Sequence, residues 1–131
     1  MDNTTLSSEI VEVLQGHGIR FAILFGSLAA GRGTFESDLD LAVDAGRALQ
    51  TSEKVTIISA LAERIGRPID LVDLHSAGEP LLGQILRHGK RIFGGNIQYA
   101  EWIRLHLFNQ ADFLPYRNRI LAERRRAWIG N

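Results

Sequence analysis

The sequence contains no cysteine, which excludes disulfide bonds and thiolate metal sites and is typical of a cytoplasmic protein. It also lacks any run of about 18 apolar residues that could span a bilayer. The N-terminus opens with Met1-Asp2-Asn3, which is polar and acidic, unlike a secretory signal. Fifteen basic and fifteen acidic side chains give a formal net charge of zero, which argues against a protein that binds nucleic acid directly through counterion release.

The zero net charge hides an uneven distribution along the chain. Residues 1–98 carry 12 acidic and 9 basic side chains, whereas residues 99–131 carry 3 acidic and 6 basic ones. Most of the late basic residues are clustered arginines: Arg117, Arg119, Arg124, Arg125 and Arg126. This cluster is either a solvated basic helix or a surface on which a partner docks.

With 131 residues, 45% of them hydrophobic, the chain has the size of one compact domain, 1–131. Hydrophobic periodicity predicts helices over residues 5–15, 52–65 and 80–88, and strands over 19–25, 38–43, 69–74 and 90–93. From about residue 97 the chain turns helical to near residue 128, with a break or kink at Pro115. We therefore expect an α/β (α+β) fold, with a small mixed sheet of three to four strands flanked by helices. The core covers about 1–95, and a long C-terminal helical arm covers about 97–129.

The inward faces of two helices can be predicted from the spacing of apolar residues. In the helix that Ser52 can cap, one stripe contains Val55, Ile58, Leu61, Ala62 and Ile65. In the helix that starts at Pro80, the inward side chains are Leu81, Leu82, Ile85 and Leu86.

A Gly-Ser pair follows the first predicted strand, at Gly26 and Ser27. Phosphate oxygens can approach backbone N–H groups closely only where no Cβ stands in the way. If a helical turn begins after Ser27, its first N–H groups also favour an anion, and the hydroxyl can donate one more hydrogen bond. Gly-Ser alone is also common in ordinary turns, so the pair predicts a phosphate site only together with its surroundings.

Those surroundings are two aspartates, Asp38 and Asp40, on the second predicted strand. Alternate side chains of a strand share a face, so both carboxylates point the same way while Leu39 and Leu41 point into the core. Adjacent carboxylates repel each other, and a divalent cation such as Mg²⁺ would remove that penalty. The alternative is two acids on a solvated edge strand. The apolar residues of this segment argue against that alternative, because they make the strand part of a core. The third predicted strand offers one further acid on this face, either Asp70 or Asp73, because their odd separation puts them on opposite faces.

The combination of Gly26-Ser27, ten residues, Asp38, one residue and Asp40 resembles the signature of the DNA polymerase beta nucleotidyltransferase superfamily. In its small size the chain resembles the minimal, MNT-type members of this superfamily. The resemblance implies a polymerase-beta-like nucleotidyltransferase fold, two Mg²⁺ ions bound by Asp38, Asp40 and Asp70, and ATP as substrate. It favours Asp70 over Asp73, because the third acid of the superfamily lies near the start of its strand, and gives Asp70 the role of general base. Gly26, Ser27 and Ser37 are then the candidate nucleotide-binding residues.

Many relatives carry a basic residue soon after Gly-Ser, where this chain has Leu28, Ala29 and Ala30. Arg32, with Thr34, could supply the missing contact to the phosphates, or both could belong to a solvated loop. The four histidines show no paired metal-ligand spacing, and the late aromatic residues, among them Trp102, indicate core or partner contacts.

The resemblance further implies an antitoxin that transfers AMP from ATP onto a tyrosine of a HEPN ribonuclease toxin, blocking its RNA site. Two alternatives stay open at this point. An adenylyltransferase could act on a small-molecule acceptor, although such enzymes usually need an added domain. A binding-only antitoxin could instead neutralise its partner by occlusion, without turnover. The late arginines suggest that the C-terminal arm is the docking element for the partner.

Overall fold

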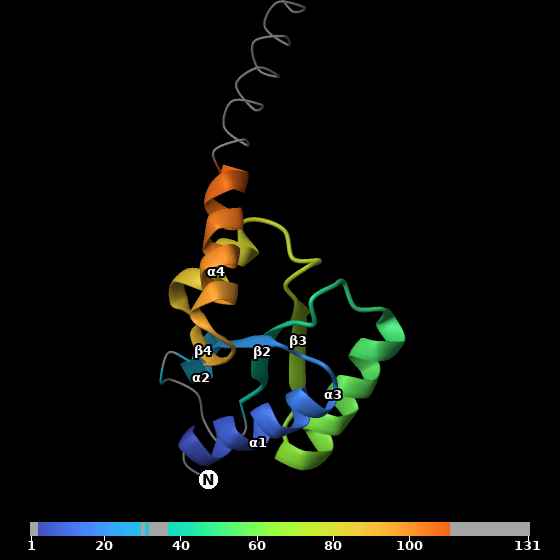
Figure 1. Cartoon of the computed structure of the whole chain (residues 1–131). Coiled ribbons are helices and arrows are strands. Elements are labelled where there is room, and N and C mark those ends of the chain that lie inside the picture. The colour runs from blue at the N-terminus through green and yellow to red at the C-terminus, as the bar shows by residue number, and fades with distance from the viewer. Residues whose placement is uncertain (1–2, 30, 32–36, 111–131) are drawn as a thin grey trace, which may run out of the picture.

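The computed structural model describes residues 3–29, 31 and 37–110. Its elements follow the predicted order: α1 (Asn3–Gly16), β1 (Phe21–Phe25), α2 (Gly26–Ala29), β2 (Leu39–Asp44), α3 (Thr51–Ile65), β3 (Ile69–Asp73), α4 (Leu81–His88) and β4 (Lys90–Phe93). Residues 96–110 are helical as well and are called helix 96–110 below; they are drawn in orange in Figure 1. The predicted arm beyond residue 110, with Pro115 and the clustered arginines, lies outside the described residues.

The four strands form one mixed sheet in the order β3-β2-β1-β4. β1 pairs antiparallel with β2 and with β4, and β2 pairs parallel with β3. The antiparallel register places Phe25 opposite Asp40, and the parallel register places Asp40 beside Asp70. The end of β1 and the starts of β2 and β3 therefore meet at one end of the sheet. The predicted mixed sheet with flanking helices is confirmed.

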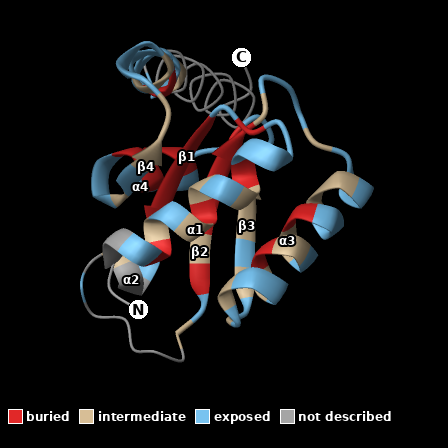
Figure 2. Cartoon of the chain, turned by 60° about the horizontal axis from the view of Figure 1, so that its bottom comes forward, coloured by how far each residue is buried: buried red, intermediate tan, exposed pale blue. Residues whose placement is uncertain are grey.

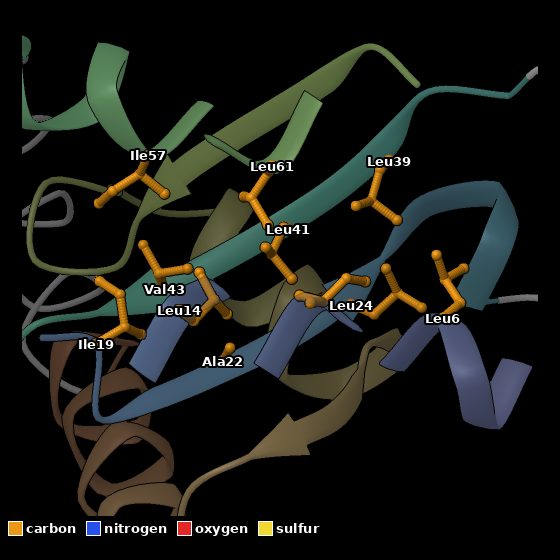
Figure 3. Close-up of a cluster of buried hydrophobic side chains, with 11 residues drawn as sticks. Leu6, Leu14, Ile19, Ala22, Leu24, Leu39, Leu41, Val43, Ile57 and Leu61 are labelled. Carbon is orange, nitrogen blue, oxygen red and sulfur yellow. The ribbon is translucent and has the colours of Figure 1, made fainter. Parts of the chain in front are cut away.

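Helices cover both faces of the sheet (Figures 1 and 2). On one face, α1 and α3 pack over β1 and β2, and Figure 3 shows Leu14 of α1 and Leu61 of α3 against Leu41 and Val43 of β2. On the other face, α4 and helix 96–110 pack over Phe21, Ile23 and Ala42 through buried side chains that include Trp102. Within the described ranges, no helix is long and apolar enough to cross a membrane.

Three details of the helix predictions were wrong. Val55 is 56% exposed, because α3 presents Ile57 and Leu61 to the sheet instead. The N-cap residue of α3 is Gln50 and not Ser52, and the backbone N–H of Gln50 donates a hydrogen bond to Glu53 Oε1 (3.0 Å). Leu81 is largely exposed, because α4 starts at this residue and only Leu82, Ile85 and Leu86 of the predicted set reach the core.

Candidate active site

Gly26 begins α2 directly after β1, in a conformation that favours glycine. Its φ is +77°, in the left-handed region, where a Cβ causes strain. A Cβ placed on Gly26 would also lie only 2.1 Å from Asp40 Oδ2 and 2.9 Å from Asp40 Cγ. Two independent constraints, backbone conformation and the close approach of a carboxylate, therefore require glycine here. The helical turn predicted after the Gly-Ser pair is present as the short α2, although the Ser27 side chain and both Arg32 and Thr34 lie outside what the structure describes.

Asp38 and Asp40 stand at the start of β2, with the fully buried Leu39 between them. Asp38 is exposed, and Asp40 is half-buried beside Gly26. Burial raises the pKa of Asp40 above its ordinary value, and the negative charges of Asp70 and Asp38 together with a hydrogen bond to Asp70 raise it further. Ser37, directly before this pair, is half-buried.

Asp70 completes the group from the neighbouring strand. It is exposed near the start of β3, and the parallel register sets it beside Asp40. A hydrogen bond between two carboxyl groups requires a proton on one of them. A cation bound beside Asp40 and Asp70 would likewise relieve the repulsion between the two carboxylates. In the described part of the chain, no three acidic or histidine side chains lie close enough together to hold a metal ion between them. The donor set is nevertheless of the type that Mg²⁺ takes, carboxylate oxygens open to solvent and to substrate phosphates.

Asp73, the other acid that the sequence offers on this strand, is buried at the end of β3. Its carboxylate accepts hydrogen bonds from the backbone N–H of Leu49 (2.7 Å) and of His75 (3.0 Å), and from Ser76 Oγ (3.2 Å). Asp73 is thus a strand-end residue whose carboxylate holds the turn that contains His75 and Ser76. All of these contacts hold the loops after β2 and β3 in place, away from Asp40.

Asp44, which was not predicted as a functional residue, is a fully buried carboxylate at the far end of β2. It accepts hydrogen bonds from Arg20 Nε (3.1 Å), from the backbone N–H of Gly46 (2.6 Å) and from Trp102 Nε1 (2.9 Å), and its Oδ1 lies 2.6 Å from His75 Nε2. Burial opposes the ionisation of Asp44, but these hydrogen bonds together hold its pKa below the ordinary value. Asp40, Ala42 and Asp44 alternate along one face of β2, and this continued alternation is the signal that could have identified the residue.

Comparison with known proteins identifies the family. The family described as polymerase beta, nucleotidyltransferase, matches residues 8–98. The protein adenylyltransferase MntA of Shewanella oneidensis is 32% identical over 89 residues, which are 66% of this chain and 64% of that protein. The chain thus spans less than two thirds of the length of this curated relative.

Two solved structures share the fold. A toxin–antitoxin structure with AMP-PNP has a TM-score of 0.71 at 26% identity and covers 88% of this chain and 98% of that one. A mutant of the toxin–antitoxin pair MntA-HpeT has a TM-score of 0.67 at 27% identity and covers 87% of this chain and 96% of that one. The family match extends over well more than half of the chain and includes all three carboxylates and the Gly-Ser turn, so the chain belongs to the polymerase beta nucleotidyltransferase family.

Proposed function

We propose that this protein is an adenylyltransferase antitoxin, which transfers AMP from ATP onto a tyrosine of a HEPN ribonuclease toxin and so neutralises it. The similarity to the protein adenylyltransferase MntA supports the proposed reaction. The similarity to a toxin–antitoxin structure with an ATP analogue supports the proposed toxin partner and the use of ATP. The observation that carries the chemistry is the contact of Asp40 with both Gly26 and Asp70, because it brings the turn after β1 and the acids of β2 and β3 to one point.

The three carboxylates fit magnesium. Asp38 and Asp40 would hold two Mg²⁺ ions, with Asp70 as a ligand of one of them, and the positive charge would relieve the repulsion that raises the pKa of Asp40. When bound, Mg²⁺ neutralises the triphosphate and lowers the pKa of the attacking hydroxyl. The protein's own part is to hold the acids together on a rigid sheet, since β2 is buried from Leu39 onward apart from Asp40 itself.

The transfer itself needs one base and a fixed nucleotide. The tyrosine oxygen attacks the α-phosphorus of ATP, so that a new P–O bond forms and the bond to pyrophosphate breaks. We assign the released proton to the carboxylate of Asp70, which is exposed toward an incoming acceptor. Gly26, Ser27 and Ser37 are the groups that hold the nucleotide, through the backbone of the turn and two hydroxyls. Catalysis is then mostly positioning and charge neutralisation.

The test compares two aspartates of the same strand in AMP transfer from labelled ATP to the purified toxin. Asp70→Asn should lower turnover by about 10²–10⁴-fold, the usual contribution of a general base, with a smaller effect on ATP binding. Asp73→Asn should leave turnover near that of the wild type at temperatures where the variant is folded, because Asp73 bonds only to loops. The opposite ranking would remove Asp70 from the mechanism.

The same assay separates the alternative functions. If the wild type labels no toxin but labels a small hydroxylated compound, the acceptor is a small molecule. If Asp40→Asn neutralises the toxin as well as the wild type does, binding alone is sufficient and transfer is not the basis of neutralisation. The proposed function requires labelled toxin in the wild type and loss of both labelling and neutralisation in Asp40→Asn.

A further inference from the structure

Helix 96–110 begins where the family match ends, at residue 98. The similarity to the toxin–antitoxin structure covers 88% of the chain, so it necessarily includes residues beyond this point. The catalytic carboxylates all lie on the sheet, and none lies on this helix. Most of the helix therefore lies beyond the segment that matches the family.

Three side chains fix which face of the helix turns inward. Tyr99 OH donates a hydrogen bond to the backbone carbonyl of Leu86 (3.3 Å), and Trp102 Nε1 donates to Asp44 (2.9 Å). His106 Nδ1 lies 2.7 Å from Glu79 Oε1, and its ring sits so close to Gly83 that a Cβ there would lie 2.4 Å from the ring. These contacts leave the helix no freedom to rotate and bury a different face.

The outward side of the same helix is apolar. Ile97 is 73% exposed, Phe108 62% and Leu107 58%, and Ile103 and Leu105 are exposed as well. Glu101 and Arg104 are its only charged side chains among residues 96–110. Large apolar side chains are normally buried when several of them gather on one helix, and within the described residues nothing covers these five.

We propose that this outward surface of helix 96–110, formed by Ile97, Ile103, Leu105, Leu107 and Phe108, is where the toxin docks. The inference rests on the proposed function, which supplies a protein partner, and it adds the place of contact. The partner's matching surface should be apolar, because one acid and one arginine cannot balance a strongly charged face. The outward surface of helix 96–110 does not suit nucleic acid, because Arg104 is its one cationic side chain and lies near Glu101.

Phe108 is the centre of the proposed contact. Together with Glu101, Arg104 and Leu105, it lines a hollow of about 420 Å³ on this side of the helix. An aromatic side chain beside a hollow is a typical anchor of a protein interface, and such residues contribute most of the binding energy. The two charged neighbours line the same hollow and would orient the partner.

The first experiment uses a matched pair of substitutions in the full chain. Phe108→Glu should weaken the affinity for the purified toxin about 30-fold or more. Val55→Glu is the control, because Val55 is exposed to a similar extent, 56%, but lies on α3 at the other face of the sheet. Its affinity should equal that of the wild type. Equal toxin affinity of Phe108→Glu and the wild type would overturn the proposal, whereas an unlabelled toxin with the wild type would overturn the proposed function itself.

The second experiment identifies the occupant, using the absence of cysteine from the chain. Phe108→Cys and Val55→Cys each introduce one thiol, whose alkylation rate by iodoacetamide is measured with and without toxin. We expect both thiols to react fast in the chain alone, and toxin to slow only the one at position 108. Slow alkylation at position 108 in the chain alone would overturn the proposal. A rate that depends on protein concentration would then identify a second copy of the chain as the occupant, and a rate that does not would identify residues 111–131. Fast alkylation at 108 in the presence of saturating toxin would also overturn it.

Discussion

Asp40 is the residue at which stability and function are opposed. It is half-buried, its nearest charged neighbours are two other acids, and its pKa is raised by burial first and by Asp70 and Asp38 after that. A raised pKa means that the folded state holds the proton more tightly than the unfolded chain does. The ionised carboxylate therefore costs stability at neutral pH, and the cost disappears as the pH falls to the ordinary value of 3.8.

Asp40→Asn should therefore stabilise the metal-free protein while abolishing AMP transfer. Because Asp40 is still partly solvated, we expect the melting temperature at pH 7 to rise by only about 1–4 °C, and this gain to vanish near pH 4. The stabilisation that Mg²⁺ and ATP give the wild type should shrink in the variant. Differential scanning fluorimetry at both pH values measures the first effect, and undiminished transfer from labelled ATP would contradict the role of Asp40.

Gly26 allows a second test with a matched control. Gly26 and Gly66 share a φ of +77°, so an added Cβ strains the backbone equally, by about 1–2 kcal/mol. Only at Gly26 would the Cβ collide with another residue, the carboxylate of Asp40, whereas nothing lies within 4 Å at Gly66. Gly26→Ala should reduce AMP transfer at least 100-fold by displacing Asp40, since misplacing a catalytic group by about 1 Å has this effect. Gly66→Ala should lose similar stability but keep its activity, and equal activities of the two variants would show that the contact does not matter.

At the scale of elements, β2 carries two different acids on one face. Asp40 belongs to the candidate active site, and Asp44 at the other end holds Trp102 of helix 96–110. His75 also packs edge-on against the Trp102 ring, with 5.0 Å between the ring centres. A single strand thus joins the catalytic end of the sheet to the helix whose outer surface we assign to the partner.

Asp44→Ala should destabilise the protein by about 2–4 kcal/mol, because it leaves the buried donor of Trp102 and the part-buried N–H of Gly46 without their acceptor. Trp102→Phe removes only one donor and should cost less, about 1–2 kcal/mol. The pKa of Asp44 lies below its ordinary 3.8, so the stability that it contributes is present above that value and is lost as the pH falls through the lower, folded value. Urea denaturation at pH 7 and near pH 3 should show the difference between Asp44→Ala and the wild type shrinking in acid.

The element predictions succeeded where one pattern dominated and failed where two competed. In residues 38–43 the alternation of polar and apolar side chains allows only one assignment of the inward face, and β2 shows this assignment. In α3, apolar residues at 55, 57, 58 and 61 offer two adjacent stripes, and only the packing against the sheet selects Ile57 and Leu61. Helix periodicity alone cannot make this choice, because it depends on where β2 and α1 place their own side chains.

For the whole molecule, residues that lie close in sequence were easier to predict than contacts between distant segments. The Gly-Ser turn and the Asp38–Asp40 pair were read from 15 consecutive positions, and the family resemblance favoured Asp70 over Asp73. The contacts of Asp44 could not be predicted in this way, because Arg20, His75 and Trp102 lie 24, 31 and 58 residues away from it. Only the folded sheet brings these four side chains together.

The uneven charge of the molecule leads to the last prediction. Acids predominate in residues 1–98 and arginines in 99–131, so a partner that contacts both helix 96–110 and the segment after it would meet an apolar surface and a basic sequence. Exchanging Arg119, Arg124, Arg125 and Arg126 for Ala together should leave thermal stability and ATP binding near the wild-type values, because we assign these arginines to the partner and not to the fold or the nucleotide. Toxin affinity should fall about 30-fold, and its dependence on salt concentration should weaken, since arginines at an interface attract an acidic partner through a screened field. Titration of toxin at two salt concentrations measures both effects. Unchanged affinity at both would assign docking to the apolar helix surface alone.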